Sequence, residues 1–181
     1  MSESHPNESS LLNSVMVFDR EPGKVRFEQL PWMDGSAWSR SAYHSLMLVV
    51  RNRDLLRYMI RKRAARDPRP RLRARLLLGA AEILDNLHDP DRLPKAAHHT
   101  VERVKAECSR REARFANALL RAMVDEAAEW IAALEREGRW ALRHSHPTWL
   151  VERWMEQIGR EETLKLLQWN QRVPKLYLSD T

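Results

Sequence analysis

Arginine side chains gather in one stretch of this sequence, from Arg51 to Arg75. The stretch holds 10 Arg and Lys62 against Asp54 and Asp67, so it carries a net charge of +9, whereas the other residues together carry −3. A guanidinium group offers a planar fork of donors that suits phosphate groups and base edges. The stretch therefore indicates contact with nucleic acid, with a solvated helix face or an anionic protein partner as the alternatives.

The spacing of these arginines suggests a shared face. Arg53, Arg57 and Arg61 recur every four residues, so they would lie on one side of a helix. Arg71 and Arg75 would stand on the outer side of the next helix, and we expect all five side chains to neutralise RNA phosphates. A second set of candidate contacts with RNA lies further along the chain: Lys95, Arg103 and Arg121.

Residue types that bind metals or act as nucleophiles are few. His98 and Glu102 are one helical turn apart, beside His99, but no third ligand follows at a typical spacing. Cys108 continues an apolar stripe, so a buried thiol is favoured over a nucleophile, and a single cysteine excludes an internal disulfide. We therefore expect no metal site and no catalytic residue.

Aromatic residues and one asparagine receive structural interpretations. Trp130, Trp149 and Trp154 lie on apolar stripes, so we expect them to pack in the core rather than stack on bases. Asn117 interrupts an apolar helix, and we expect its side chain to hydrogen-bond to a buried loop or helix end.

The composition favours helices. The 181 residues include 24 Leu and 19 Ala, but only 5 Gly and 14 Val and Ile together, too few turn and β-branched residues for a sandwich or barrel. No apolar run approaches the ~20 residues that span a bilayer, and Met1 to Ser10 lack the apolar core of a secretory signal. These features predict an all-α, cytoplasmic protein without a membrane partner.

Polar caps and helix breakers divide the chain. Residues 1–35 are expected to be irregular or partly disordered, with at most a small hairpin between residues 15–18 and 25–27. From Ser36 onward the apolar residues recur with helical spacing, which predicts a helical bundle over residues 36–140 and a helical connector over residues 141–181. Within them, helices are expected to begin or end at the following places: Asn52 or Asp54, Asp67-Pro68, Pro90 to Pro94, Ser109, Gly138, Ser145 to Pro147, Gly159 and Asn170.

Three segments resemble a known family. RLLLGAAEIL at residues 75–84 and FANALLR at residues 115–121 resemble helices of NusB-like RNA-binding domains. HPTWLVERW at residues 146–154, followed by Gly159, Glu161-Glu162 and Asn170, is similar to the connector after this domain in bacterial ribosomal RNA cytosine-C5 methyltransferases of the RsmB (Sun/Fmu) type. The resemblance covers about residues 37–178 and implies a NusB-like helical bundle.

The resemblance implies binding to RNA, and to ribosomal RNA in particular. In these methyltransferases a catalytic half follows, with a glycine-rich cofactor loop and catalytic cysteines. Here there is no G-x-G-x-x-G, and no cysteine follows Cys108, so we expect neither S-adenosylmethionine binding nor catalysis on this chain. The usual first helix of the fold is not recognisable in the sequence, and His98 stands where the family often has asparagine.

The predicted function is therefore an RNA-binding module related to the N-terminal domain of these methyltransferases, without cofactor. One alternative is a NusB-type factor that regulates transcription antitermination through RNA and protein partners. Another is a truncated piece of an active ribosomal RNA methyltransferase. A separate methyltransferase or transcription-factor chain is the protein partner that these interpretations imply.

Overall fold

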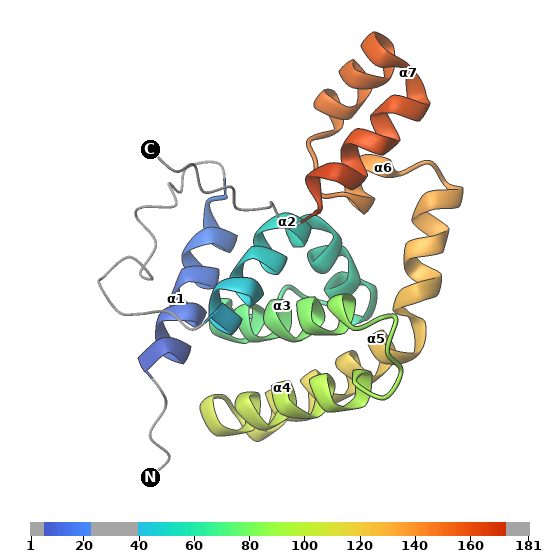
Figure 1. The fold of residues 1–181 in the computed structure, drawn as a ribbon. Coiled ribbons are helices and arrows are strands. Elements are labelled where there is room, and N and C mark those ends of the chain that lie inside the picture. Colours follow the sequence, from blue (N-terminus) through green and yellow to red (C-terminus); the bar gives the residue numbers. More distant parts are fainter. Residues whose placement is uncertain (1–5, 23–39, 173–181) are drawn as a thin grey trace, which may run out of the picture.

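The computed structural model describes residues 6–22 and 40–172, and every regular element in these two ranges is a helix (Figure 1). The helices are α1 (Pro6–Arg20), α2 (Arg40–Arg63), α3 (Pro70–Asp85), α4 (Leu93–Glu107), α5 (Arg110–Arg136), α6 (Trp140–Arg143) and α7 (Thr148–Asn170). The predicted all-α class is confirmed. None of the helices in the described ranges combines the length and the apolar character that crossing a bilayer requires.

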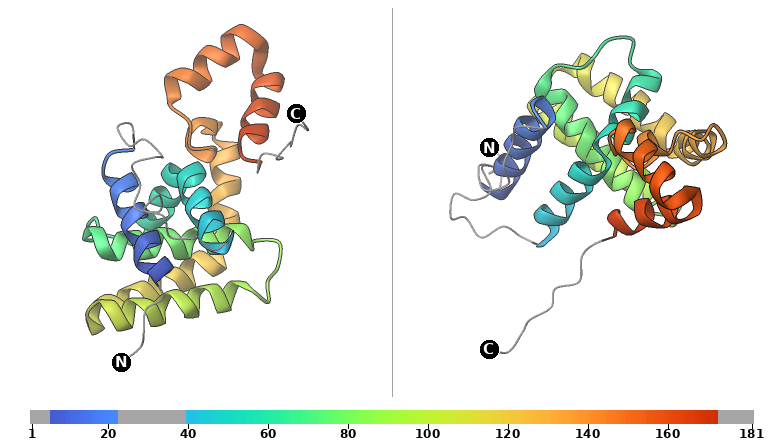
Figure 2. Two further views of the ribbon diagram at one scale, coloured as in Figure 1. Left: turned by 60° about the vertical axis from the view of Figure 1, so that its left-hand side comes forward. Right: turned by 90° about the horizontal axis from the view of Figure 1, so that it is seen from above.

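Helix α3 lies at the centre of the bundle and contacts α1, α2, α4 and α5 (Figure 1, Figure 2). Leu76 and Ile83 on its apolar stripe are fully buried. Gly79 allows α4 to approach closely, because a Cβ atom there would stand only 2.6 Å from Thr100 Oγ1. An isolated helix of 16 residues is marginal in water, so burial of this stripe is what stabilises α3.

Helix α1 corrects the prediction for the N-terminal segment. Pro6–Arg20 is helical rather than irregular, and its buried face, formed by Leu12, Val15 and Phe18, packs against α2 and α3. The proposed hairpin is wrong, because residues 15–18 belong to this helix; residues 25–27 and Ser36 lie outside the described ranges. Ser, Asn and Asp inside α1 have low helix propensity, so tertiary packing decides its conformation.

Most of the expected helix boundaries are confirmed. Ser109 forms a capping box with Glu112 at the start of α5, and Gly138, with φ +69°, follows the end of that helix. Helix α3 begins at Pro70 rather than at Pro68. Gly159, with φ +79°, divides α7 into two helical arms, and Asn170 is its last residue.

A kink at Asn52 connects α2 to the C-terminal part of the chain. Asn52 has non-helical angles, φ −116° and ψ 15°. In a regular helix the Leu55 N–H would donate to the Arg51 carbonyl. Here the Leu55 N–H donates to Ser145 Oγ at 3.2 Å, and the Arg51 carbonyl accepts from Gln171 Nε2 at 3.3 Å. The residues on both sides of α7 are thus attached to the kink.

The two arms of α7 form a helical hairpin that stands away from the bundle (Figure 1, Figure 2). Trp130 of α5 is buried, as expected for a core tryptophan, and Trp154 is half-buried. Trp149 is 63% exposed, so the core prediction is wrong for this residue. It lies on the apolar stripe of the first arm, but the described part of the chain does not cover that side.

Candidate nucleic-acid interface

A groove of about 640 Å³ lies between the C-terminal end of α1, the second half of α2, the start of α3 and the α6–α7 junction. We call it the arginine groove, because six arginines and three aspartates line it. The arginines are Arg20, Arg53, Arg57, Arg61, Arg73 and Arg139, and the aspartates are Asp19, Asp54 and Asp67. This composition leaves an excess of three positive charges.

Asp19 organises the floor of the arginine groove. Its side chain is only 3% exposed, and it forms ion pairs with Arg53, Arg57 and Arg73. Arg57 Nη1 donates to both carboxylate oxygens, at 2.9 and 3.1 Å. Burial raises the pKa of the Asp19 carboxyl, but the hydrogen bonds and charges of Arg57 and Arg73 outweigh it and hold that pKa below its ordinary value. Asp19 therefore stays ionised and fixes the three guanidinium groups.

Asp67 binds two of the same arginines from the solvent side. It lies in the loop between α2 and α3, and its side chain is 47% exposed. Oδ2 of Asp67 accepts from Arg57 Nη2 at 3.1 Å and from Arg73 Nη1 at 3.0 Å. Arg57 and Arg73 are thus held between a buried and an exposed carboxylate.

Other cations of the groove remain available. Arg20 and Arg61 are exposed and form no ion pair within the described ranges. Arg139 lies over the ring of Tyr58, with its guanidinium carbon 5.5 Å from the ring centroid, and its only ion pair with a described residue is at 3.6 Å, with Glu137. These side chains can turn toward an incoming anion at little cost.

The first set of predicted contact residues is divided by the structure. Arg53, Arg57 and Arg61 share one face of α2, as predicted, and all three line the groove. Arg71 lies outside the groove, is half-exposed and pairs with Glu107 at 3.4 Å.

Arg75 is buried, which corrects the prediction that it stands on the outer side of its helix. Its side chain is 4% exposed and forms ion pairs with Glu107 and, at 3.2 Å, with Glu8. Glu8 belongs to α1, the helix that the sequence did not reveal, and α1 packs against α3. What looked like an outer face of α3 is therefore an interface between helices.

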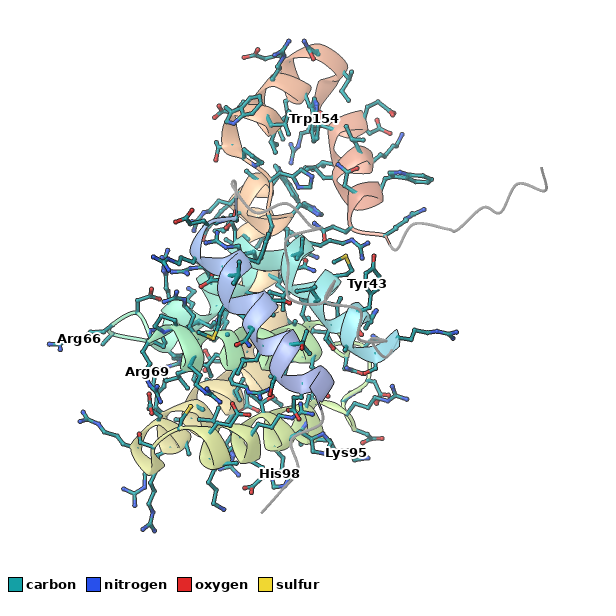
Figure 3. All side chains as sticks on the ribbon, turned by 90° about the vertical axis from the view of Figure 1, so that its left-hand side faces the viewer. Tyr43, Arg66, Arg69, Lys95, His98 and Trp154 are labelled. Atoms are coloured by element: carbon teal, nitrogen blue, oxygen red, sulfur yellow. The ribbon has the colours of Figure 1, made fainter. Side chains whose placement is uncertain are left out.

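The second set of predicted contact residues lies apart from the groove. Arg103 pairs with Glu8 at 2.6 Å. Lys95 and Arg121 are exposed on α4 and α5, where Arg121 lines a cavity of about 430 Å³ with His98 and Asn117. Figure 3 shows Arg66 and Arg69 of the basic stretch on the left of the view, His98 at the bottom and Lys95 at the lower right. None of the three residues of the second set lines the arginine groove, although Arg103 shares Glu8 with Arg75 of the first set.

The side chain of Asn117 also lies in a different environment from the one that the sequence predicted. Its side chain is exposed at the edge of this second cavity rather than satisfying a buried helix end. A polar residue in an apolar helical segment can lie on the solvent face, which the spacing alone does not distinguish.

Sequence reasoning missed three contributors to the groove. Arg73 lies within the basic stretch and could have been chosen by its charge. Arg20 and Arg139 are far from that stretch in sequence and come to the groove only through the packing of α1 and of the segment after α5. No periodicity joins these positions.

The described residues contain no group of three or more His, Cys, Asp and Glu side chains that could hold a metal ion. His98 and His99 are both exposed, with ring centroids 6.3 Å apart. Cys108 is half-buried, and burial raises the pKa of its thiol, which disfavours the nucleophilic thiolate.

His144, which lies near the groove, is expected to make the fold less stable in acid. It is buried at the end of α6, and burial, with Arg143 and His146 nearby, lowers its pKa from 6.5 to about 4. A histidine whose pKa is lowered by folding stays neutral in the folded state, so protonation favours unfolding. We expect the free energy of unfolding to be constant above pH 6.5 and to fall by ~3 kcal/mol toward pH 4.

Urea unfolding from pH 8 to pH 4, followed by circular dichroism, measures this effect. The matched control is His144→Asn, which cannot titrate and should show a flatter profile over the same range. Equal slopes for the two proteins would assign the acid sensitivity to other groups.

No protein-family model, no curated protein and no solved structure matches this chain. The structure shows an all-helical bundle in which α1, α2, α3 and the α6–α7 junction form a groove rich in arginine.

Proposed function

We propose that this chain is an RNA-binding module and that the RNA backbone follows the arginine groove. The observation that carries the proposal is the convergence of six arginines from distant parts of the sequence on one groove with three aspartates. Arginine forks bind phosphate oxygens through charge-assisted hydrogen bonds, and backbone contacts dominate the affinity of proteins for nucleic acids.

The finer part of the proposal rests on the resemblance of residues 146–154 and the two helical segments to NusB-like domains. By that resemblance the RNA is ribosomal, and the chain acts beside a methyltransferase or a transcription factor. Binding without methyl transfer is proposed, because these 181 residues contain no G-x-G-x-x-G and no cysteine after Cys108.

The test replaces two arginines that the fold does not need. Arg61→Gln with Arg139→Gln removes two charges from the groove and leaves the ion pairs of Asp19 intact. We expect weaker binding to a short single-stranded RNA, and a slope of log affinity against log salt that is flatter by roughly 1–2. Fluorescence anisotropy over a range of salt concentrations measures both quantities.

The matched control is Lys95→Gln with Arg121→Gln, which removes the same charge from α4 and α5. If only this control pair weakens binding, the RNA contacts lie on that face instead of in the groove. If neither pair has an effect, the RNA proposal is contradicted, and direct binding to a protein partner becomes the better interpretation. Crosslinking to RNA in cells, followed by sequencing, identifies the RNA bound and tests the ribosomal assignment.

A further inference from the structure

We propose that the Asp67 carboxylate occupies a phosphate-binding position in the arginine groove and that a phosphate group of bound RNA displaces it. The inference rests on the proposed function and specifies how the groove binds its ligand. Asp67 Oδ2 accepts hydrogen bonds from two different arginines, Arg57 and Arg73, at 3.1 and 3.0 Å. Two guanidinium donors converging on one oxygen is an arrangement that a phosphate oxygen can also accept.

The donors are held in place independently of Asp67. Arg57 Nη1 and Arg73 Nε donate to Asp19, which leaves Arg57 Nη2 and Arg73 Nη1 directed at Asp67. Arg73 Nη1 also donates to the Pro68 carbonyl at 2.9 Å. Both arginine side chains are already ordered by their bonds to Asp19, so a new anion meets donors in a fixed geometry without ordering them itself.

The two aspartates differ in how easily they leave. Asp19 is on a helix, is 3% exposed and has three arginine partners, whereas Asp67 is in a loop and is 47% exposed. Exposed ion pairs contribute little to stability, so displacing Asp67 costs little. Asp19 would remain as the fixed counter-charge that orients the arginines.

The surroundings favour a phosphate over a carboxylate as the incoming group. Once Asp67 has left, the lining residues carry one more net positive charge, and Arg61 and Arg139 remain in the same groove. A phosphate group offers more acceptor oxygens than a carboxylate and can bond to arginines from several sides. The volume of about 640 Å³ is in the range of small-ligand sites, which suits a nucleotide better than a folded protein segment.

The experiment compares Asp67→Asn with Asp91→Asn. Both variants remove one exposed carboxylate, but Asp91 lies in the loop before α4 and outside the groove. We expect Asp67→Asn to bind a short single-stranded RNA about three- to tenfold more tightly than the wild type, because the competing pair is lost. Asp91→Asn should change the affinity less than twofold, and the gain for Asp67→Asn should shrink at high salt.

A second arm uses inorganic phosphate at constant ionic strength. Phosphate should raise the thermal midpoint of Asp67→Asn more than that of the wild type or of Asp91→Asn, because ligand that binds only the folded state stabilises it. Equal affinity and equal thermal response in the two variants overturns the phosphate-binding position, even where the wild type binds RNA through Arg61 and Arg139.

The remaining outcomes are also decisive. A phosphate response without RNA binding supports the position and contradicts the proposed function. A poly-glutamate peptide that competes for the groove better than the RNA contradicts both, and indicates an acidic protein partner.

Discussion

Replacing Asp19 with alanine is expected to lower the free energy of unfolding by about 3–5 kcal/mol, the usual cost of removing one partner from a buried ion pair. The carboxylate is 3% exposed, and the side chains of Arg53, Arg57 and Arg73 are only 13–20% exposed. Without Asp19, three positive charges would lie together in a poorly solvated place. Urea unfolding followed by circular dichroism measures the loss.

Asp67→Ala is the matched control, because it removes the same group from two of the same arginines. Asp67 is 47% exposed, so this change should cost no more than about 1 kcal/mol. If Asp19→Ala is no more destabilising than Asp67→Ala, burial does not govern the cluster.

The Asp19 cluster also has a pH dependence with a definite sign. The pKa of the Asp19 carboxyl is lowered by folding, so its contribution is complete above the ordinary value of 3.8 and is lost as the pH falls through the folded value. The loss from His144 occurs between pH 6.5 and about 4. The two groups therefore act in separate pH windows, and Asp19→Asn should flatten only the more acidic one.

Leu76→Ala is expected to lower the free energy of unfolding by about 2–5 kcal/mol, through lost burial of apolar surface and the cavity left behind. Leu76 is 0% exposed on α3, the helix that contacts α1, α2, α4 and α5, so little of the surrounding structure is free to close over the gap. The denaturant midpoint should fall while the slope of the unfolding free energy stays constant.

A control for Leu76→Ala is Ile158→Ala, which also shortens a branched aliphatic side chain. Ile158 is 47% exposed on α7, so its loss should cost less than about 1 kcal/mol. A midpoint that is unchanged by Leu76→Ala would contradict the central position of α3.

Stability and RNA binding are expected to depend on different arginines of the groove. Arg57 and Arg73 are structural as well as exposed to the groove, since both bind Asp19, whereas Arg61 forms no ion pair within the described ranges. Loss of RNA binding in an Arg57 variant would therefore not distinguish unfolding of the protein from loss of a contact with RNA. The pair Arg61 and Arg139 separates the two effects.

The local features of this protein follow from its sequence alone. Periodicity and caps predicted the helical class, the helix start at Ser109 and the break at Gly159, because these depend on residues three or four positions apart. The same local reasoning placed Arg53, Arg57 and Arg61 on one face of α2.

Which charged side chains are available to a ligand depends on how the helices pack. Arg75 and Arg61 look alike in the sequence, yet Arg75 is 4% exposed beneath α1 and Arg61 is exposed. Helix α1 itself is poor in strong helix formers and is stabilised by packing, so its acidic residues Asp19 and Glu8 could not be assigned to Arg57 and Arg75 beforehand. Ion pairs form between side chains that are 38 and 67 residues apart here, and no local pattern encodes such distances, because they are set by how the helices pack.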